Sequence, residues 1–569
     1  MVGVPGRSKG CHNCRSRKIK CDGERPSCKN CAKSNRICTG YQKKHAFILS
    51  KDMVADGATS SHDGSALPAD RSESSMVMVS RWRKSSSKPA ISSAQLSASS
   101  TPRDNDLPSA IGNTTLPKEI PVRSVFRDRI LALNLEDPHN VPTVRLAYGE
   151  RNDWLLHILD LPELTPALED SLLAIAVAQL GQRTSRPELL HESLKLYTKG
   201  LAELRLDILN PSKRNNDQNL AACLASLLYE VTASPGGTQS GYKAHYLGTL
   251  ELLRLRGAGA HGSGLAHSVF KVLRIHAVFN GIVKREKSFL ADAEWVDGPW
   301  PQPDSKPPFE RLIDILLGLP DLSAQRHAQW TTQNPLGVLS GALASVRSGT
   351  IMEAGLEKWF DSFKATVPGA LYHPELSKFD SAVDSPDTGR IFPVAFQFPA
   401  FVIANNLVYY WVALMAVQAH LCFTYAMLTQ LVAMLDAAGR ETFSCTCDGS
   451  EAPCLQHFSM ERLPALGHRE LWPRTTAYNI AQSVEYFMEQ RQQGFGPGEI
   501  VPALALVQGF WRCAPGDWNR EVAWVDDMIK RIREQGVSIG GCLGKSVKQD
   551  LQAVTRIFCG QGTIRPNFN

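Results

Sequence analysis

The sequence has no apolar segment at its N-terminus: the first ten residues, MVGVPGRSKG, are basic and contain only a few scattered hydrophobic residues. A secretory signal needs an apolar stretch of about 7–15 residues in this region. We therefore expect the chain to stay in a reducing compartment, where cysteines remain thiols. This expectation bears on how the chain uses its 14 cysteines.

The sequence also lacks catalytic signatures, since neither HExxH nor GxSxG occurs in it. Residues 257–262 fit the pattern GxGxxG, but leucines at helical spacing precede them, whereas a dinucleotide site needs a strand there. We interpret this segment as a turn that ends a helix. The chain is predicted not to be an enzyme, because no catalytic constellation supports the alternative of a helical domain that converts a small molecule.

Strand-like alternation is scarce, and amphipathic helical patterns repeat from about residue 119. The clearest begins at Thr165-Pro166, a cap residue followed by proline at the first helical position, and closes at Gly181. These patterns predict a large all-α domain over residues 119–569. The expected helices lie near residues 165–181, 190–208, 217–231, 243–256, 266–286, 309–318, 400–437, 475–491, 500–512 and 521–535.

No Asp, Glu, Lys or Arg occurs between Arg390 and Asp436. Residues 407–428 are long enough to span a membrane, which takes about 20 apolar residues. However, Gln418 and His420 lie inside this stretch, and its flanks show no basic excess on one side. We interpret it as a buried central helix and expect no membrane contact; a membrane-tethered regulator is the alternative.

Six cysteines stand close together near the start of the chain. The unit Cys-x2-Cys-x6-Cys occurs twice, separated by six residues, and supplies Cys11, Cys14, Cys21, Cys28, Cys31 and Cys38. Three sulfurs cannot complete the four-coordinate shell that zinc prefers, so each half needs the other. Six sulfurs can complete two four-coordinate shells only if two of the sulfurs bind both ions. Cys11 and Cys28 are the first cysteines of the two units, and the sequence repeat makes them the natural bridging pair. A disulfide framework would use the same even count, but the expected reducing compartment favours two zinc ions.

Positive charge is concentrated around these cysteines. Residues 1–50 carry twelve Lys or Arg and two acidic residues, a formal charge of +10, whereas the whole chain carries +6. The remaining residues therefore sum to −4. A compact basic module on a nearly neutral protein is typical of binding to a phosphate backbone.

The segment resembles the fungal Zn2Cys6 (zinc binuclear cluster) transcription factors, which share its cysteine spacing, its basic run from Arg15 to Lys20 and its loop proline, Pro26. The resemblance implies that the first helix points its C-terminal end into the major groove of double-stranded DNA. It implies that Lys18 contacts the base edges of a CGG-type triplet, where guanine presents N7 and O6 acceptors. Arg15, Arg17 and Lys20 would mostly hold phosphates.

Three parts follow from this interpretation. Residues 1–48 form the predicted Zn2Cys6 DNA-binding domain, and residues 49–118 form a disordered linker, because 16 of the 68 residues from 51 to 118 are serine and apolar residues are scattered. No apolar heptads follow Cys38, so a zipper is not expected. Any homodimer should form through the C-terminal domain.

The helical part resembles the fungal-specific transcription factor domain that accompanies such modules. The residues that carry the likeness are Tyr229-Glu230, the His-x-x-Gly pattern at 245–248, Arg256-Gly257, the segment 483–487 and Ala523-Trp524-Val525. The resemblance implies a regulatory domain without catalytic residues.

A second group of metal-ligand residue types lies in a Gly/Ser/Thr-rich stretch: Cys445, Cys447, Cys454 and His457. The group lacks a CxxC pair, so we expect cysteines without metal in a mobile loop, with a second zinc site as the alternative. Metal content distinguishes them, because two zinc ions per chain exclude the site and three support it.

Together these features predict a nuclear, zinc-dependent, sequence-specific DNA-binding transcription factor of RNA polymerase II genes that works with the transcription machinery. The family resemblance alone extends this to control of a metabolic or secondary-metabolite pathway. The alternatives are the membrane-tethered regulator and a small-molecule-responsive protein that the zinc module targets to chromatin.

Overall fold

A computed structural model describes residues 11–17, 19–22, 24, 28–34, 36 and 38, and then residues 153–534 except 233–238, 301, 303–304, 332–333, 444, 446, 448–452, 468–471, 490–495 and 515. The chain divides into two compact units, Met1–Ser109 and Ala110–Asn569, which we describe separately. The predicted linker at 49–118 lies outside the described residues. So do residues 119–152 and 535–569 of the predicted helical domain.

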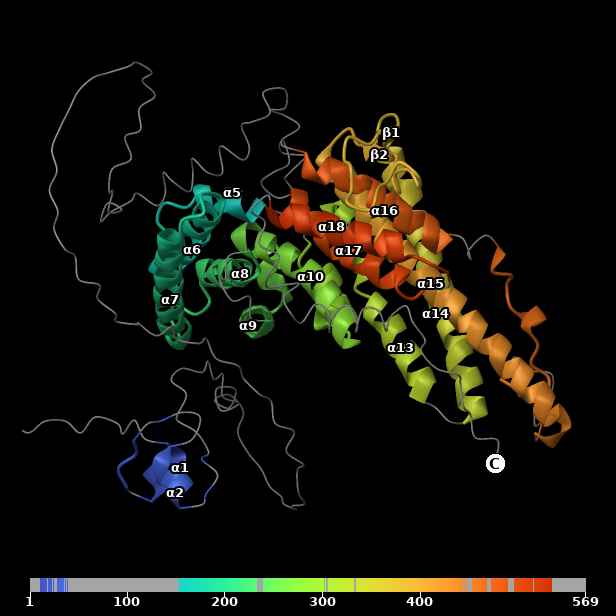
Figure 1. Cartoon of the computed structure of the whole chain (residues 1–569), viewed down its shortest axis with the longest axis horizontal. Helices are drawn as coiled ribbons and strands as arrows, with labels where there is room; N and C mark the ends of the chain where they lie inside the picture. Colours follow the sequence, from blue (N-terminus) through green and yellow to red (C-terminus); the bar gives the residue numbers. More distant parts are fainter. Residues whose placement is uncertain are drawn as a thin grey trace, which may run out of the picture. The chain divides into compact units, whose positions relative to one another are not determined.

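The first unit contains two short helices, α1 (His12–Ser16) and α2 (Lys29–Lys33), each directly after the first cysteine of one repeat (Figure 1). Cys28 is the N-cap residue of α2, and its side chain accepts a hydrogen bond from the Cys31 backbone N–H. A side-chain acceptor at this position satisfies a backbone donor that the first helical turn leaves without a partner. The cysteine that begins each repeat therefore also lies at the start of a helix.

The second unit is largely helical, as predicted (Figure 1). Its α-helices are α5 (Asp153–Leu159), α6 (Pro166–Arg183), α7 (Pro187–Leu209), α8 (Asp217–Thr232), α9 (Gln239–Arg256), α10 (Gly264–Lys284), α11 (Ala293–Asp297), α12 (Pro308–Leu316), α13 (Leu319–Thr331), α14 (Pro335–Thr366), α15 (Phe401–Ala438), α16 (Trp472–Met488), α17 (Gly496–Trp511) and α18 (Asn519–Glu534).

Local capping signals predicted helix ends well. Helix α6 begins at Pro166, and the Thr165 side chain accepts from the Leu168 backbone N–H, as the Thr-Pro pair predicts. Helix α9 ends at Arg256, and Gly257 follows with a φ of 76°, a conformation that glycine adopts at little cost. The GxGxxG segment is therefore a helix-ending turn that leads into the 3-10 helix η2 (Ala258–His261), with no strand before it.

The sequence patterns do not predict the short helices α5 and α11 or the longer helices α13 and α14. Helix α14 does begin with a cap and a proline, since the Asn334 side chain accepts from the Leu336 N–H and Pro335 follows it. Four glycines within the helix lower its intrinsic propensity and obscured the pattern. One of them is required by packing: a Cβ at Gly349 would lie 2.7 Å from Leu421 Cδ2 of α15.

The prediction of an all-α domain also missed one small sheet. Strands β1 (His373–Leu376) and β2 (Val394–Gln397) pair antiparallel, with His373 opposite Gln397. β2 packs on α16, and its last three residues are buried. Each strand is only four residues long, too short to show a clear alternating pattern.

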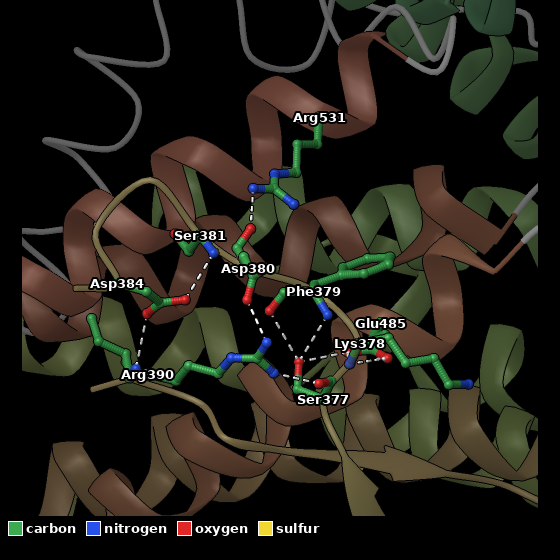
Figure 2. A network of polar contacts seen from close by, with 10 residues as sticks. Ser377, Lys378, Phe379, Asp380, Ser381, Asp384, Arg390, Glu485 and Arg531 are labelled. Carbon is green, nitrogen blue, oxygen red and sulfur yellow. Dashed lines mark hydrogen bonds and ion pairs between the residues drawn. The ribbon is translucent and has the colours of Figure 1, made fainter. Parts of the chain in front are cut away.

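The loop between β1 and β2 is tied to two helices (Figure 2). Glu485 of α16 is buried and accepts hydrogen bonds from Ser377 Oγ at 2.7 Å and from the Lys378 backbone N–H at 2.9 Å. Arg531 of α18 donates to the Asp380 carbonyl oxygen. The glutamate of the 483–487 segment, which carries part of the family resemblance, therefore fixes a loop.

Helix α15 is the central helix of the domain, as the charge-free stretch predicts. Among the described residues it is the one helix long and apolar enough to cross a membrane. Yet 67% of its most apolar window is buried, and it packs against α12, α13, α14, α16 and α17. The sequence of α15 is continuously apolar because other helices pack against it on several sides.

Candidate metal centre and nucleic-acid interface

The six N-terminal cysteines gather into two groups of four sulfurs. Cys11, Cys14, Cys21 and Cys28 form one group, and Cys11, Cys28, Cys31 and Cys38 form the other. Within each group all ligand atoms lie within 4.8 Å of one another. The groups share Cys11 and Cys28, the pair that the sequence repeat predicts to bridge two ions.

The sulfur spacing fits tetrahedral zinc. Cys28 Sγ lies 3.6 Å from Cys11 Sγ and 3.6 Å from Cys14 Sγ, and Cys11 Sγ lies 3.7 Å from Cys31 Sγ. A Zn–S distance of about 2.3 Å in a tetrahedron places ligand sulfurs about 3.8 Å apart. These three sulfur–sulfur distances therefore match the edges of zinc–sulfur tetrahedra.

Backbone N–H groups point at the sulfurs in the same way in both halves. The Cys14 N–H donates to Cys11 Sγ at 3.3 Å, and the Cys31 N–H donates to Cys28 Sγ at 3.3 Å. The Cys11 N–H also donates to Cys21 Sγ at 3.4 Å. Such bonds favour a negatively charged sulfur, so the start of each helix is built to hold thiolates.

Burial works in the opposite direction, because it raises the pKa of the Cys14 and Cys28 thiols. Both side chains are fully buried. A bound dication overcomes this effect, since a thiol that coordinates a metal is deprotonated. Crowded, buried sulfurs that receive backbone N–H bonds therefore fit a zinc centre, and zinc would supply folding free energy to this small module.

Two side chains that the sequence analysis did not single out join the two halves. The Asp22 side chain accepts from the Lys29 backbone N–H at 3.0 Å, and this bond lowers the pKa of the Asp22 carboxyl group. Asn30 donates to the Lys20 carbonyl oxygen at 2.6 Å. Asp22 lies seven residues before Lys29 and outside the first turn of α2, so no local capping signal in the sequence identifies it.

The candidate DNA-binding residues lie around the end of α1. Arg17 and Lys20 are exposed, and Arg15 lies within α1. The Arg17 guanidinium donates to Ser34 Oγ at 3.2 Å, at the end of α2. Lys18 lies outside the described residues.

In the helical domain, three of the residues that carry the family resemblance, Tyr229, Glu230 and His245, meet around Tyr197 of α7. The Tyr197 hydroxyl donates to Glu230 Oε1 at 2.7 Å and lies 2.7 Å from His245 Nε2, and the rings of Tyr197 and Tyr229 stack at 4.2 Å. A Cβ at Gly241 would lie 2.4 Å from the Glu230 carboxyl carbon. These residues join α7, α8 and α9, so they are placed to stabilise the fold.

Burial of two histidines predicts a loss of stability in mild acid. Burial lowers the pKa of both His245 and His261 to about 4. In the unfolded chain each imidazole takes up a proton below a pH of about 6.5, whereas in the folded chain each stays neutral until about pH 4. The unfolded state therefore binds more protons in this window, and the free energy of unfolding falls as the pH is lowered from 6.5 to 4.

We expect each histidine to lower the free energy of unfolding by about 2 kcal/mol when the pH falls from 7 to 5. Urea unfolding followed by circular dichroism at pH 7, 6 and 5 measures this loss. The variant His245→Gln should show a shallower dependence of the free energy of unfolding on pH. His191→Gln, which changes an exposed histidine of α7, should leave the slope as it is. Equal slopes in the protein and in His245→Gln would contradict the prediction.

The structure also brings together Cys445, Cys447, Cys454 and His457, whose ligand atoms all lie within 4.8 Å of one another. The sequence pattern predicts free cysteines without metal in a mobile loop, and the structure places the four side chains together through contacts that the pattern does not reveal.

Comparison with known proteins matches both units. Residues 9–46 match the fungal Zn(2)-Cys(6) binuclear cluster domain, and residues 139–321 match the fungal specific transcription factor domain. No solved structure shows a significant match to the chain.

Three curated relatives are similar over short segments. The transcriptional regulatory protein moc3 of Schizosaccharomyces pombe is 43% identical over 53 residues, which are 9% of this chain and 10% of that protein. The aspercryptin biosynthesis cluster-specific transcription regulator atnN of Emericella nidulans is 54% identical over 39 residues, 7% of this chain and 6% of its own length. The arginine metabolism regulation protein II of Saccharomyces cerevisiae is 52% identical over 54 residues, 9% of this chain and 6% of its own length. The chain thus aligns with a tenth or less of each relative.

Proposed function

We propose that this chain controls RNA polymerase II genes from the nucleus by binding a specific DNA sequence, because it matches both the fungal Zn(2)-Cys(6) binuclear cluster domain and the fungal specific transcription factor domain. The family is one of zinc-dependent, DNA-binding transcription factors and not of enzymes. The observation that carries the proposal is the pair of four-sulfur groups that share Cys11 and Cys28.

We propose that the six cysteines ligate two zinc ions and that Cys11 and Cys28 bridge them. The sulfur distances and the repeated N–H bonds to sulfur support this assignment. Zinc would hold α1 and α2 together in a segment with very little apolar core of its own. The protein would therefore lose its DNA-binding surface when it loses the metal.

We propose that the exposed end of α1 meets the major groove. The exposed Arg17 and Lys20 would contact phosphates, as would Arg15, and these contacts fix the position of the module without reading sequence. Lys18 would contact guanine N7 and O6 in a CGG-type triplet. This role rests on the match to the cluster domain and on the basic run itself.

We propose that the helical domain regulates transcription through the transcription machinery. We also propose that any homodimer forms through the helical domain. Two of the relatives are named as a biosynthesis cluster-specific transcription regulator and an arginine metabolism regulation protein, and they support control of a metabolic or secondary-metabolite pathway. Selection of bound sequences from a random duplex pool tests the proposal, because it gives both the triplet and the number of half-sites. A pool without enrichment would overturn it.

Lys18→Ala should remove base preference more than general affinity. We expect the preference for the selected triplet over a scrambled duplex to fall about 10-fold or more, because one good contact to a base contributes about 1–3 kcal/mol of discrimination. Lys20→Ala is the matched control and should weaken binding to both duplexes about equally. Fluorescence anisotropy at one fixed salt concentration measures both effects, and equal weakening by Lys18→Ala would argue against its role in base recognition.

A further inference from the structure

Four metal-ligand side chains meet beyond the C-terminal end of α15. Cys445 and Cys447 follow the 3-10 helix η5 (Arg440–Thr442), and Cys454 and His457 precede the 3-10 helix η6 (Met460–Arg462). Cys445 Sγ lies 2.8 Å from Cys447 Sγ and 3.6 Å from Cys454 Sγ. His457 Nδ1 lies 3.4, 3.2 and 3.6 Å from the sulfurs of Cys445, Cys447 and Cys454.

The two segments that carry these ligands are held by contacts outside the group. Arg440 pairs with Asp436 of α15 at 2.5 Å and donates to the Phe458 carbonyl oxygen at 2.5 Å. Phe458 is buried in a small core that α14 and α15 share, and the Tyr425 hydroxyl donates to the Pro464 carbonyl oxygen at 2.7 Å. Packing and hydrogen bonds therefore bring the outgoing and returning segments together beside the end of α15.

Backbone hydrogen bonds also fix the conformation of the chain next to the ligands. The Phe458 N–H donates to the Cys454 carbonyl oxygen at 3.0 Å, which closes a turn between Cys454 and His457. The Cys447 N–H donates to Cys445 Sγ at 3.4 Å. The turn places Cys454 and His457 on the same side, and the bond to sulfur favours a thiolate.

Three sulfurs and one imidazole nitrogen are one of the closed ligand sets of structural zinc. We propose that Cys445, Cys447, Cys454 and His457 bind one further Zn²⁺ ion, which links the residues that follow η5 to those that precede η6 at the α14–α15 end of the helical domain. The ligand set leaves no position open for water or substrate, so the site is structural. Cys445, Cys447 and Cys454 are free cysteines. The 2.8 Å between Cys445 Sγ and Cys447 Sγ is shorter than the edge of about 3.8 Å of a zinc–sulfur tetrahedron, so these two sulfurs would move apart by about 1 Å when the ion binds.

The zinc content of the purified full-length protein tests this site. Cys454→Ala should contain one zinc ion fewer per chain than the unmodified protein, measured by inductively coupled plasma mass spectrometry against protein concentration. The difference of one ion does not depend on how much zinc the N-terminal cluster holds, so failure of the cluster and failure of this site are distinguishable. Cys422→Ala, which changes a cysteine of α15 outside the group, is the matched control and should leave the zinc content unchanged.

A second variant keeps the test decisive if Cys454→Ala folds poorly. His457→Ala retains every cysteine and should also lose one zinc ion, while circular dichroism reports whether the helical content is kept. Equal zinc content in the protein and in both folded variants would overturn the proposal. A disulfide between Cys445 and Cys447 in anaerobically purified protein, found by peptide mapping, would overturn it as well.

Discussion

Cys28→Ala is expected to remove both zinc ions from the N-terminal unit and to abolish sequence-specific DNA binding. Cys28 Sγ belongs to both groups of four sulfurs, and the same atom accepts the Cys31 N–H at the start of α2. One substitution therefore removes a ligand from each metal position and the cap of one helix. Structural zinc contributes about 10–16 kcal/mol to the folding of such small modules, far more than the rest of this segment can replace.

The affinity for the selected duplex should fall by about 10³-fold or more, to the level of non-specific attraction between basic residues and phosphates. Cys21→Ala is the informative comparison, because Cys21 belongs to only one of the two groups. It should release fewer zinc ions than Cys28→Ala. Zinc content and fluorescence anisotropy at fixed salt measure the two effects.

Cys422→Ala again serves as the control and should bind DNA as the unmodified protein does. If Cys28→Ala retained its zinc or its duplex affinity, the assignment of Cys28 as a shared ligand would be wrong. If Cys28→Ala lost its zinc but kept sequence-specific binding, the claim that DNA recognition requires the zinc ions would be wrong instead.

Arg274→Ala is expected to destabilise the helical domain by about 3–5 kcal/mol. Arg274 of α10 is fully buried and pairs with two acidic residues of α12, Glu310 and Asp314. Its guanidinium also donates to the Glu310 carbonyl oxygen at 3.2 Å. Burial raises the pKa of the Glu310 carboxyl group, whereas the charges of Arg274 and Lys271 lower it.

Removal of the guanidinium leaves the Glu310 side chain buried and without this partner, and that unpaired group accounts for most of the expected cost. Arg274→Ala combined with Glu310→Gln should therefore be more stable than Arg274→Ala alone. Urea unfolding measures the free energy of each variant.

An exposed ion pair provides the matched control. Lys195 and Glu192 of α7 lie 2.6 Å apart with both side chains largely accessible, so Lys195→Ala should change the free energy of unfolding by about 0.5 kcal/mol or less. A similar loss for Lys195→Ala and Arg274→Ala would show that burial does not decide the contribution of these pairs.

The sequence by itself determined the features that depend on residues near one another in the chain. The doubled Cys-x2-Cys-x6-Cys unit predicts two metal positions with shared sulfurs, because ligand count and coordination number are local chemistry. The Thr165-Pro166 pair predicts the start of α6, and Gly257 predicts the end of α9, because caps act within one helical turn. The charge-free stretch before Asp436 predicts the buried helix α15.

Only the tertiary structure decided which distant residues meet. Helix α14 forms despite its glycines, because its apolar residues pack against α15, and Gly349 permits the close approach to Leu421. Tyr197, Glu230 and His245 come from three helices and meet in one buried network. Cys445 and His457 approach each other because Arg440 and Phe458 hold the returning segment beside α15. Spacing along the chain carries no information about such contacts, since they depend on how whole helices pack.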